Sequence, residues 1–127
     1  MMVIRGTQLT TFDVAPDGES FSIGVTDERG QPAALILPSD CLNGLLMTLP
    51  EMVRRSLQAR FRDASMRLVY PVGSSQVEPS AVSGHVIVTL RTPDGFSVSF
   101  GFSPVDLVHL WTQSVSVSRK AADIVTN

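Results

Sequence analysis

The sequence is poor in the residues that support disulfide, metal or membrane chemistry. It contains one cysteine, Cys41, which excludes an internal disulfide and a thiolate zinc cluster within one chain. No apolar run approaches the roughly 20 residues that span a bilayer. The N-terminal stretch 1–12 also lacks the apolar core of a signal peptide. These absences predict a cytoplasmic protein without a membrane segment.

Charge is also scarce. Charged residues make up 17% of the chain and the net charge is −2, so the surface offers no strong field for a polyanion. Apolar residues, in contrast, make up 43% of the 127 residues, enough to form a hydrophobic core. The length fits a single domain spanning 1–127. Because so little polar surface is available to keep a monomer soluble, we expect a homodimer.

The clearest local pattern is a hairpin followed by a helix. Val86–Leu90 is rich in β-branched residues, and in Phe96–Phe102 large apolar side chains alternate with serine and glycine, as in a half-buried strand. Thr92–Gly95 between them reads as a turn. Ser103 then suits a helix N-cap, and one face of the following helix carries Leu107, Leu110, Trp111 and Val115. We expect Phe100, in the middle of its strand, to be a central core residue.

The same order occurs earlier in the chain. Alternating residues at 21–25 and 33–37 flank a loop in which Gly30 matches Gly95 at an offset of 65. Ser39 is the expected cap of the next helix, although Ser39 and Ser103 match at an offset of 64. Pro50 lies within the apolar stripe of that helix and predicts a kink or a break.

Each copy is expected to begin with one more strand. Leu9–Val14 precedes the turn Ala15–Gly18, and the expected counterpart is Arg67–Val72, followed by a loop over Gly73–Gly84. The predicted fold is therefore α+β, an internally duplicated βββα-βββα chain with repeats at 7–61 and 66–122. The helices should pack on the sheet face that bears Phe21, Ile23, Leu35, Phe96, Val98 and Phe100. One sheet and two facing sheets are both compatible with the pattern.

Residues suited to catalysis are few and isolated. His85 precedes a strand and His109 lies on the second helix, whereas Cys41 lies in the first turn of the first helix. Lone residues of these types are usually surface or packing residues. No cofactor or metal site is expected, since the glycines are isolated and the acidic residues lie mostly in turns. A small-molecule enzyme with a pocket near Cys41 and His109 is the more distant alternative.

Two features favour binding over catalysis. Five arginines fall within 14 residues, namely Arg54, Arg55, Arg60, Arg62 and Arg67. Such a cluster can contact phosphate, so a nucleic-acid-associated protein is the first alternative, although a solvated helix face explains it more simply. The second feature is the small, uncharged side of the strand at Ser97 and Ser99, which another protein layer can approach closely. We therefore expect a small non-enzymatic intracellular protein that binds a protein partner or assembles with itself.

Overall fold

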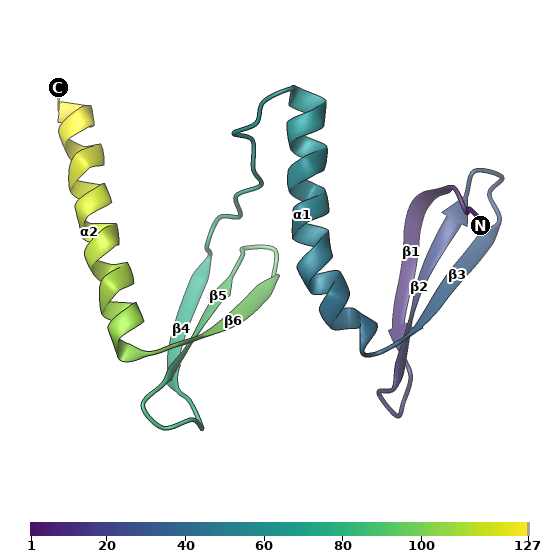
Figure 1. Cartoon of the computed structure of the whole chain (residues 1–127), viewed down its shortest axis with the longest axis horizontal. Coiled ribbons are helices and arrows are strands. Elements are labelled where there is room, and N and C mark those ends of the chain that lie inside the picture. The colour runs from purple at the N-terminus through teal and green to yellow at the C-terminus, as the bar shows by residue number, and fades with distance from the viewer. Residues whose placement is uncertain (127) are drawn as a thin grey trace. The chain divides into compact units, whose positions relative to one another are not determined.

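The computed structural model describes residues 1–126 and divides into two compact units, one over Met1–Leu68 and one that begins at Val69. Each unit is a three-stranded antiparallel meander followed by one helix (Figure 1). The predicted α+β class and the βββα-βββα order are therefore confirmed. Of the two arrangements left open by the sequence, the strands form two separate three-stranded sheets.

The first unit consists of β1 (Gly6–Val14), β2 (Ser20–Asp27), β3 (Pro32–Pro38) and α1 (Cys41–Phe61). Residues that stand opposite each other on neighbouring strands share a sheet face. Phe12, Ile23 and Leu35 form one such row. The next row is Val14, Phe21 and Leu37, so this face is apolar throughout. We call it the first apolar face; the opposite face carries Asp13 and Ser22.

An irregularity in β1 shapes this sheet. Leu9 pairs with Val25 and Thr11 pairs with Gly24, so Thr10 is an extra residue with no partner of its own. The hydroxyls of both threonines lie over Gly24: a Cβ at that position would meet Thr11 Oγ1 at 2.5 Å and Thr10 Oγ1 at 2.9 Å. A side chain at position 24 would therefore have to displace both hydroxyls.

The second unit consists of β4 (Ser74–Pro79), β5 (Val86–Arg91), β6 (Ser97–Phe102) and α2 (Pro104–Thr126). Val77, Val88 and Phe100 form one row across its three strands. The neighbouring rows on this face include Leu90 with Val98 and Val86 with Phe102. We call this side the second apolar face. Ser97, Ser99 and Gly101 lie on the other side of β6, as the alternation predicted.

The first strand of this unit differs from the sequence prediction. Arg67–Val72 forms no strand, and β4 lies within the stretch that was predicted to be a loop. The polar composition and Pro79 suggested a loop. Yet β4 is an edge strand, where a missing N–H is tolerated because one side has no ladder to complete.

The start of α1 also corrects a prediction. Ser39 does not cap this helix: Asp40 is the N-cap residue, and the Ser39 hydroxyl instead donates to the Gly18 carbonyl oxygen at 2.6 Å. In the second unit the prediction holds, since the Asp106 N–H donates to Ser103 Oγ at 3.2 Å. Pro50 does not divide α1, which is continuous from Cys41 to Phe61. A proline removes one backbone hydrogen bond, and the remaining turns keep this helix together.

The hydrophobic core of each unit is thin. Among the residues whose side chains are described, Phe21 is the one buried large hydrophobic residue, at 5% exposure. It lies where four leucines of the first half of α1 (Leu42, Leu45, Leu46 and Leu49) and the first apolar face line a common hollow of about 250 Å³. Phe100, predicted to be a central core residue, is instead 50% exposed. The main contacts of α1 are with β3 and those of α2 are with β6, so most of each apolar face has no layer on it within its own unit.

Candidate interaction surfaces

Both apolar faces carry large side chains that their own unit leaves exposed. On the first apolar face Phe12 is 85% exposed and Leu35 is 56% exposed. On the second, Phe100 and Val77 are also largely exposed. Single exposed hydrophobic residues are normal, but contiguous rows of them mark an interaction surface. The unusual feature is therefore the continuity of each row from strand to strand.

Each unit by itself leaves a large part of its apolar face exposed, as Phe12 and Phe100 show. Neither unit is closed as a globule on its own.

The arginine cluster lies on α1 and just beyond it. Arg54 forms a close ion pair and hydrogen bonds with the Glu51 carboxylate, and Arg55 Nε donates to Glu51 Oε1 at 3.0 Å. Arg54 Nη1 also donates to Gln58 Oε1 at 3.0 Å. These contacts neutralise part of the cluster. They turn two of the five guanidinium groups along the helix surface rather than towards a common anion.

The Glu51 carboxyl responds to the same contacts. Its hydrogen bonds from Arg54 first, and then from Arg55, lower the pKa of Glu51 to about 2. The pKa of Arg54 is raised by the same bond. Glu51 is therefore ionised at neutral pH and opposes the positive charge of the cluster.

The remaining arginines mark the end of the helix. Arg60 lies over the Phe61 ring, 5.9 Å from its centroid. Arg62 closes α1 in the left-handed conformation (φ 50°), a position that usually favours glycine. Arg67 follows in the segment without regular structure between α1 and β4. The five residues thus follow the length and end of one helix, which is the arrangement expected of a solvated helix surface.

Cys41 and His109 do not belong to the same unit. Cys41 is the first residue of α1 and has an exposed, free thiol. His109 lies on α2, and His85 lies in the loop before β5, where its Nδ1 is 3.2 Å from the Ser83 carbonyl oxygen. Neither unit by itself holds both Cys41 and His109.

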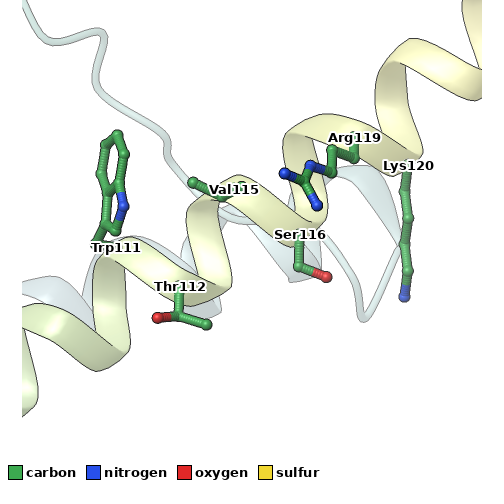
Figure 2. A pocket seen from close by; sticks show the side chains of 6 residues that line it. All are labelled: Trp111, Thr112, Val115, Ser116, Arg119 and Lys120. Carbon is green, nitrogen blue, oxygen red and sulfur yellow. The ribbon is translucent and has the colours of Figure 1, made fainter.

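The hollows on α2 are shallow. One, of about 460 Å³, is lined by side chains between Trp111 and Lys120, and Figure 2 shows that they all come from this one helix. A second lies beside Leu107, Leu110 and Trp111. A single helix supplies no opposing wall, so these hollows lack the convergent polar groups of a small-molecule site. Trp111, which lines both hollows, is 70% exposed.

Among the described residues, no group of three or more histidine, cysteine, aspartate or glutamate side chains is placed to hold a metal ion. Over the same residues, neither helix combines the length and the apolar character needed to cross a bilayer. Searches against protein-family models, curated proteins and solved structures found no match for this chain.

The sequence analysis did not single out Phe12 as an exposed residue. Apolar residues at 9, 12 and 14 break strict alternation, because the bulge adds Thr10 to this strand. This irregular spacing is the sequence feature that could have indicated the bulge. By contrast, Ser97 and Ser99 lie where they were predicted, and the Ser99 hydroxyl bonds to Thr89 Oγ1 across the sheet at 2.8 Å.

Proposed function

We propose that this chain is a non-enzymatic assembly protein that forms a homodimer, in which contact with a second copy of the chain removes part of the apolar faces from water. The observation that carries this proposal is the uncovered apolar face of each unit, with Phe12 and Phe100 as its largest exposed side chains. Exposed rows of this kind lower the free energy when another apolar layer removes them from water.

The size of the exposed surface supports a permanent partner. The apolar rows run across all three strands of each unit. Obligate homodimers bury roughly 2,000–5,000 Å² or more, and their interfaces resemble a domain core cut in half. A second copy is the simplest occupant because it carries matching apolar faces of the same dimensions.

Cytoplasmic location is part of the proposal. The free thiol of Cys41 is exposed, and an exposed free thiol is suited to a reducing compartment. The low net charge of −2 further favours association over solvation of separate chains.

Light scattering after gel filtration tests the proposal. The wild type should have twice the mass of one chain at low micromolar concentration. Phe12→Lys places a charge on the first apolar face and should yield a monomer with unchanged circular dichroism. Asp13→Lys is the matched control, because Asp13 is the neighbour of Phe12 in the strand and its side chain lies on the opposite face of the sheet. A wild type that remains monomeric at high micromolar concentration would show that the proposal is wrong.

A further inference from the structure

The outer edge of β6 has backbone hydrogen-bonding groups that are not satisfied within its own three-stranded sheet. Hydrogen-bonded and non-hydrogen-bonded pairs alternate along an antiparallel ladder. Thr92 and Phe96 form a hydrogen-bonded pair, since the Thr92 N–H donates to the Phe96 carbonyl oxygen at 2.8 Å. By alternation, the backbone groups of Val98, Phe100 and Phe102 point towards β5. Those of Ser97, Ser99 and Gly101 therefore point outward from the sheet.

The direction of Arg91 agrees with this assignment. Its carbonyl oxygen accepts from the Gly73 N–H at 2.8 Å, on the β4 side of β5. The backbone N–H and C=O of Arg91 therefore point towards β4 and not towards its partner Ser97. Arg91 and Ser97 form a non-hydrogen-bonded pair, so the backbone N–H and C=O of Ser97 face the open edge.

The other edge strands carry features that discourage association, and β6 does not. Proteins protect sheet edges with prolines, charges and bulges. Among the edges described in residues 1–126, β1 has the bulge at Thr10 and a charge at Asp13. Likewise β3 has a proline at each end, and β4 ends in Glu78 and Pro79. In contrast, β6 (Ser97–Phe102) has no charge, no proline and no register shift.

We propose that β6 pairs antiparallel with β6 of a second copy, about a two-fold axis at Ser99. This inference rests on the proposed function and names the strand through which the dimer forms. Ser99 then faces Ser99 of the second copy, and Ser97 faces Gly101. All three residues direct their backbone N–H and C=O groups outward, so in this register each of these groups has a hydrogen-bonding partner on the second copy. Strand β6 is thus complementary to itself.

The pairing also brings the second apolar faces of the two copies together edge to edge, with Phe100 of one copy opposite Val98 of the other. Opposed residues of paired strands share a sheet face, so the two three-stranded sheets become one six-stranded sheet with Val98 and Phe100 of both copies on the same side. The α2 helices follow directly from β6 in both copies. The small side chains of Ser97, Ser99 and Gly101 leave the opposite side of this junction flat.

Disulfide cross-linking tests the strand and its register together. In a Cys41→Ser background, Ser99→Cys places two thiols across the axis with Cα atoms about 5.5 Å apart, as in a hydrogen-bonded pair. That separation lies within the range of roughly 4.4–6.8 Å found for disulfides. Mild oxidation should convert Ser99→Cys to a covalent dimer. Ser97→Cys is the matched control: its thiols would be four residues apart along the strands, about 14 Å, and should not cross-link.

Loss of one backbone donor gives a second, independent measurement. Ser99→Pro removes an N–H that faces outward, so it should abolish the dimer on light scattering while the monomer keeps its circular dichroism. Ser99→Thr keeps both the N–H and the hydroxyl and should remain dimeric. A dimeric wild type with no Ser99→Cys cross-link and a dimeric Ser99→Pro would overturn this inference and leave the proposed function standing. A cross-link at Ser97→Cys alone would overturn the register, and a monomeric wild type would overturn the proposed function itself.

Discussion

Asp27 and Thr92 occupy the same position in the two hairpins, and each accepts the backbone N–H of the residue four places later through its side-chain oxygen. The Gln31 N–H donates to Asp27 Oδ1 at 2.8 Å, and the Phe96 N–H donates to Thr92 Oγ1 at 3.1 Å. The loop glycines, Gly30 and Gly95, both have positive φ. They donate to the backbone carbonyl oxygens of Asp27 and Thr92, each at 3.0 Å. The two turns are thus built alike at an offset of 65, by different side chains.

The buried Thr92 hydroxyl should be measurable in the stability of the second unit. Thr92→Val keeps the shape but leaves the Phe96 N–H and Asp94 without this partner, so unfolding free energy should fall by about 1–3 kcal/mol. Thr92→Ser keeps the hydroxyl and should cost far less. Chemical denaturation of the two variants compares them directly. Equal losses would mean that the hydroxyl contributes little.

The loss of unfolding free energy caused by Phe21→Ala should not depend on protein concentration, whereas the loss caused by Phe100→Ala should. Phe21→Ala removes a buried ring and should cost about 3–5 kcal/mol at every concentration. Phe100 is 50% exposed within one chain, so Phe100→Ala should cost most where the dimer is populated. Urea melts at two protein concentrations test this. A Phe100→Ala effect as large as that of Phe21→Ala in a dilute monomer would contradict the exposed position of this ring.

The bulge in β1 should make position 24 intolerant of side chains. Gly24→Val would force the Thr10 and Thr11 hydroxyls aside and should destabilise the first unit by about 1–3 kcal/mol. Gly101→Ala is the control, because nothing lies within 4 Å of a Cβ at that strand position. Thermal melts should show a loss for Gly24→Val and little change for Gly101→Ala. A harmless Gly24→Val would mean that the threonines move away freely.

The Glu51 ion pairs should be lost only in strong acid. The folded pKa of about 2 lies below the ordinary glutamate value of about 4.3. The contribution of these ion pairs to stability is therefore fully present at a pH above the ordinary glutamate pKa, and it disappears as the pH falls towards about 2. A carboxyl titration by NMR should show this pKa, and Arg54→Gln should raise it more than Arg55→Gln, because the Arg54 hydrogen bond is its main cause.

A second carboxyl provides the control for that titration. The Ser65 hydroxyl and N–H lower the pKa of Asp63, which should not respond to Arg54→Gln. A Glu51 pKa near the ordinary value in the wild type would show that these ion pairs do not form in solution.

The arginines should be dispensable for folding and assembly. Replacing Arg54, Arg55 and Arg60 with glutamine removes exposed charges, and exposed ion pairs contribute little to stability. The triple variant should keep the fold and the mass of the wild type. Titration with random oligonucleotides at two salt concentrations tests the alternative. A wild-type complex of micromolar affinity that weakens steeply with salt, and is absent from the variant, would favour nucleic-acid association.

Local patterns predicted most of the fold, because turns, alternation and helical spacing are properties of short stretches. The hairpin from Val86 to Phe102 is an example. Strand β4 was missed since an edge strand need not be apolar, and Ser39 failed as a cap because its hydroxyl binds Gly18 instead. The exposure of Phe100 was also missed: alternation shows that one face is apolar, but it does not show what covers that face.

Both sheets are meanders in which every strand pairs with its neighbour in the chain. Such contacts close short loops, so each unit can form quickly and on its own. During synthesis, the first unit is complete before the strands of the second have left the ribosome. Its apolar face is then bare while the rest of the chain is still being made. Nascent chains halted once residue 68 has left the ribosome should therefore bind a holdase chaperone, and Phe12→Lys should weaken that capture.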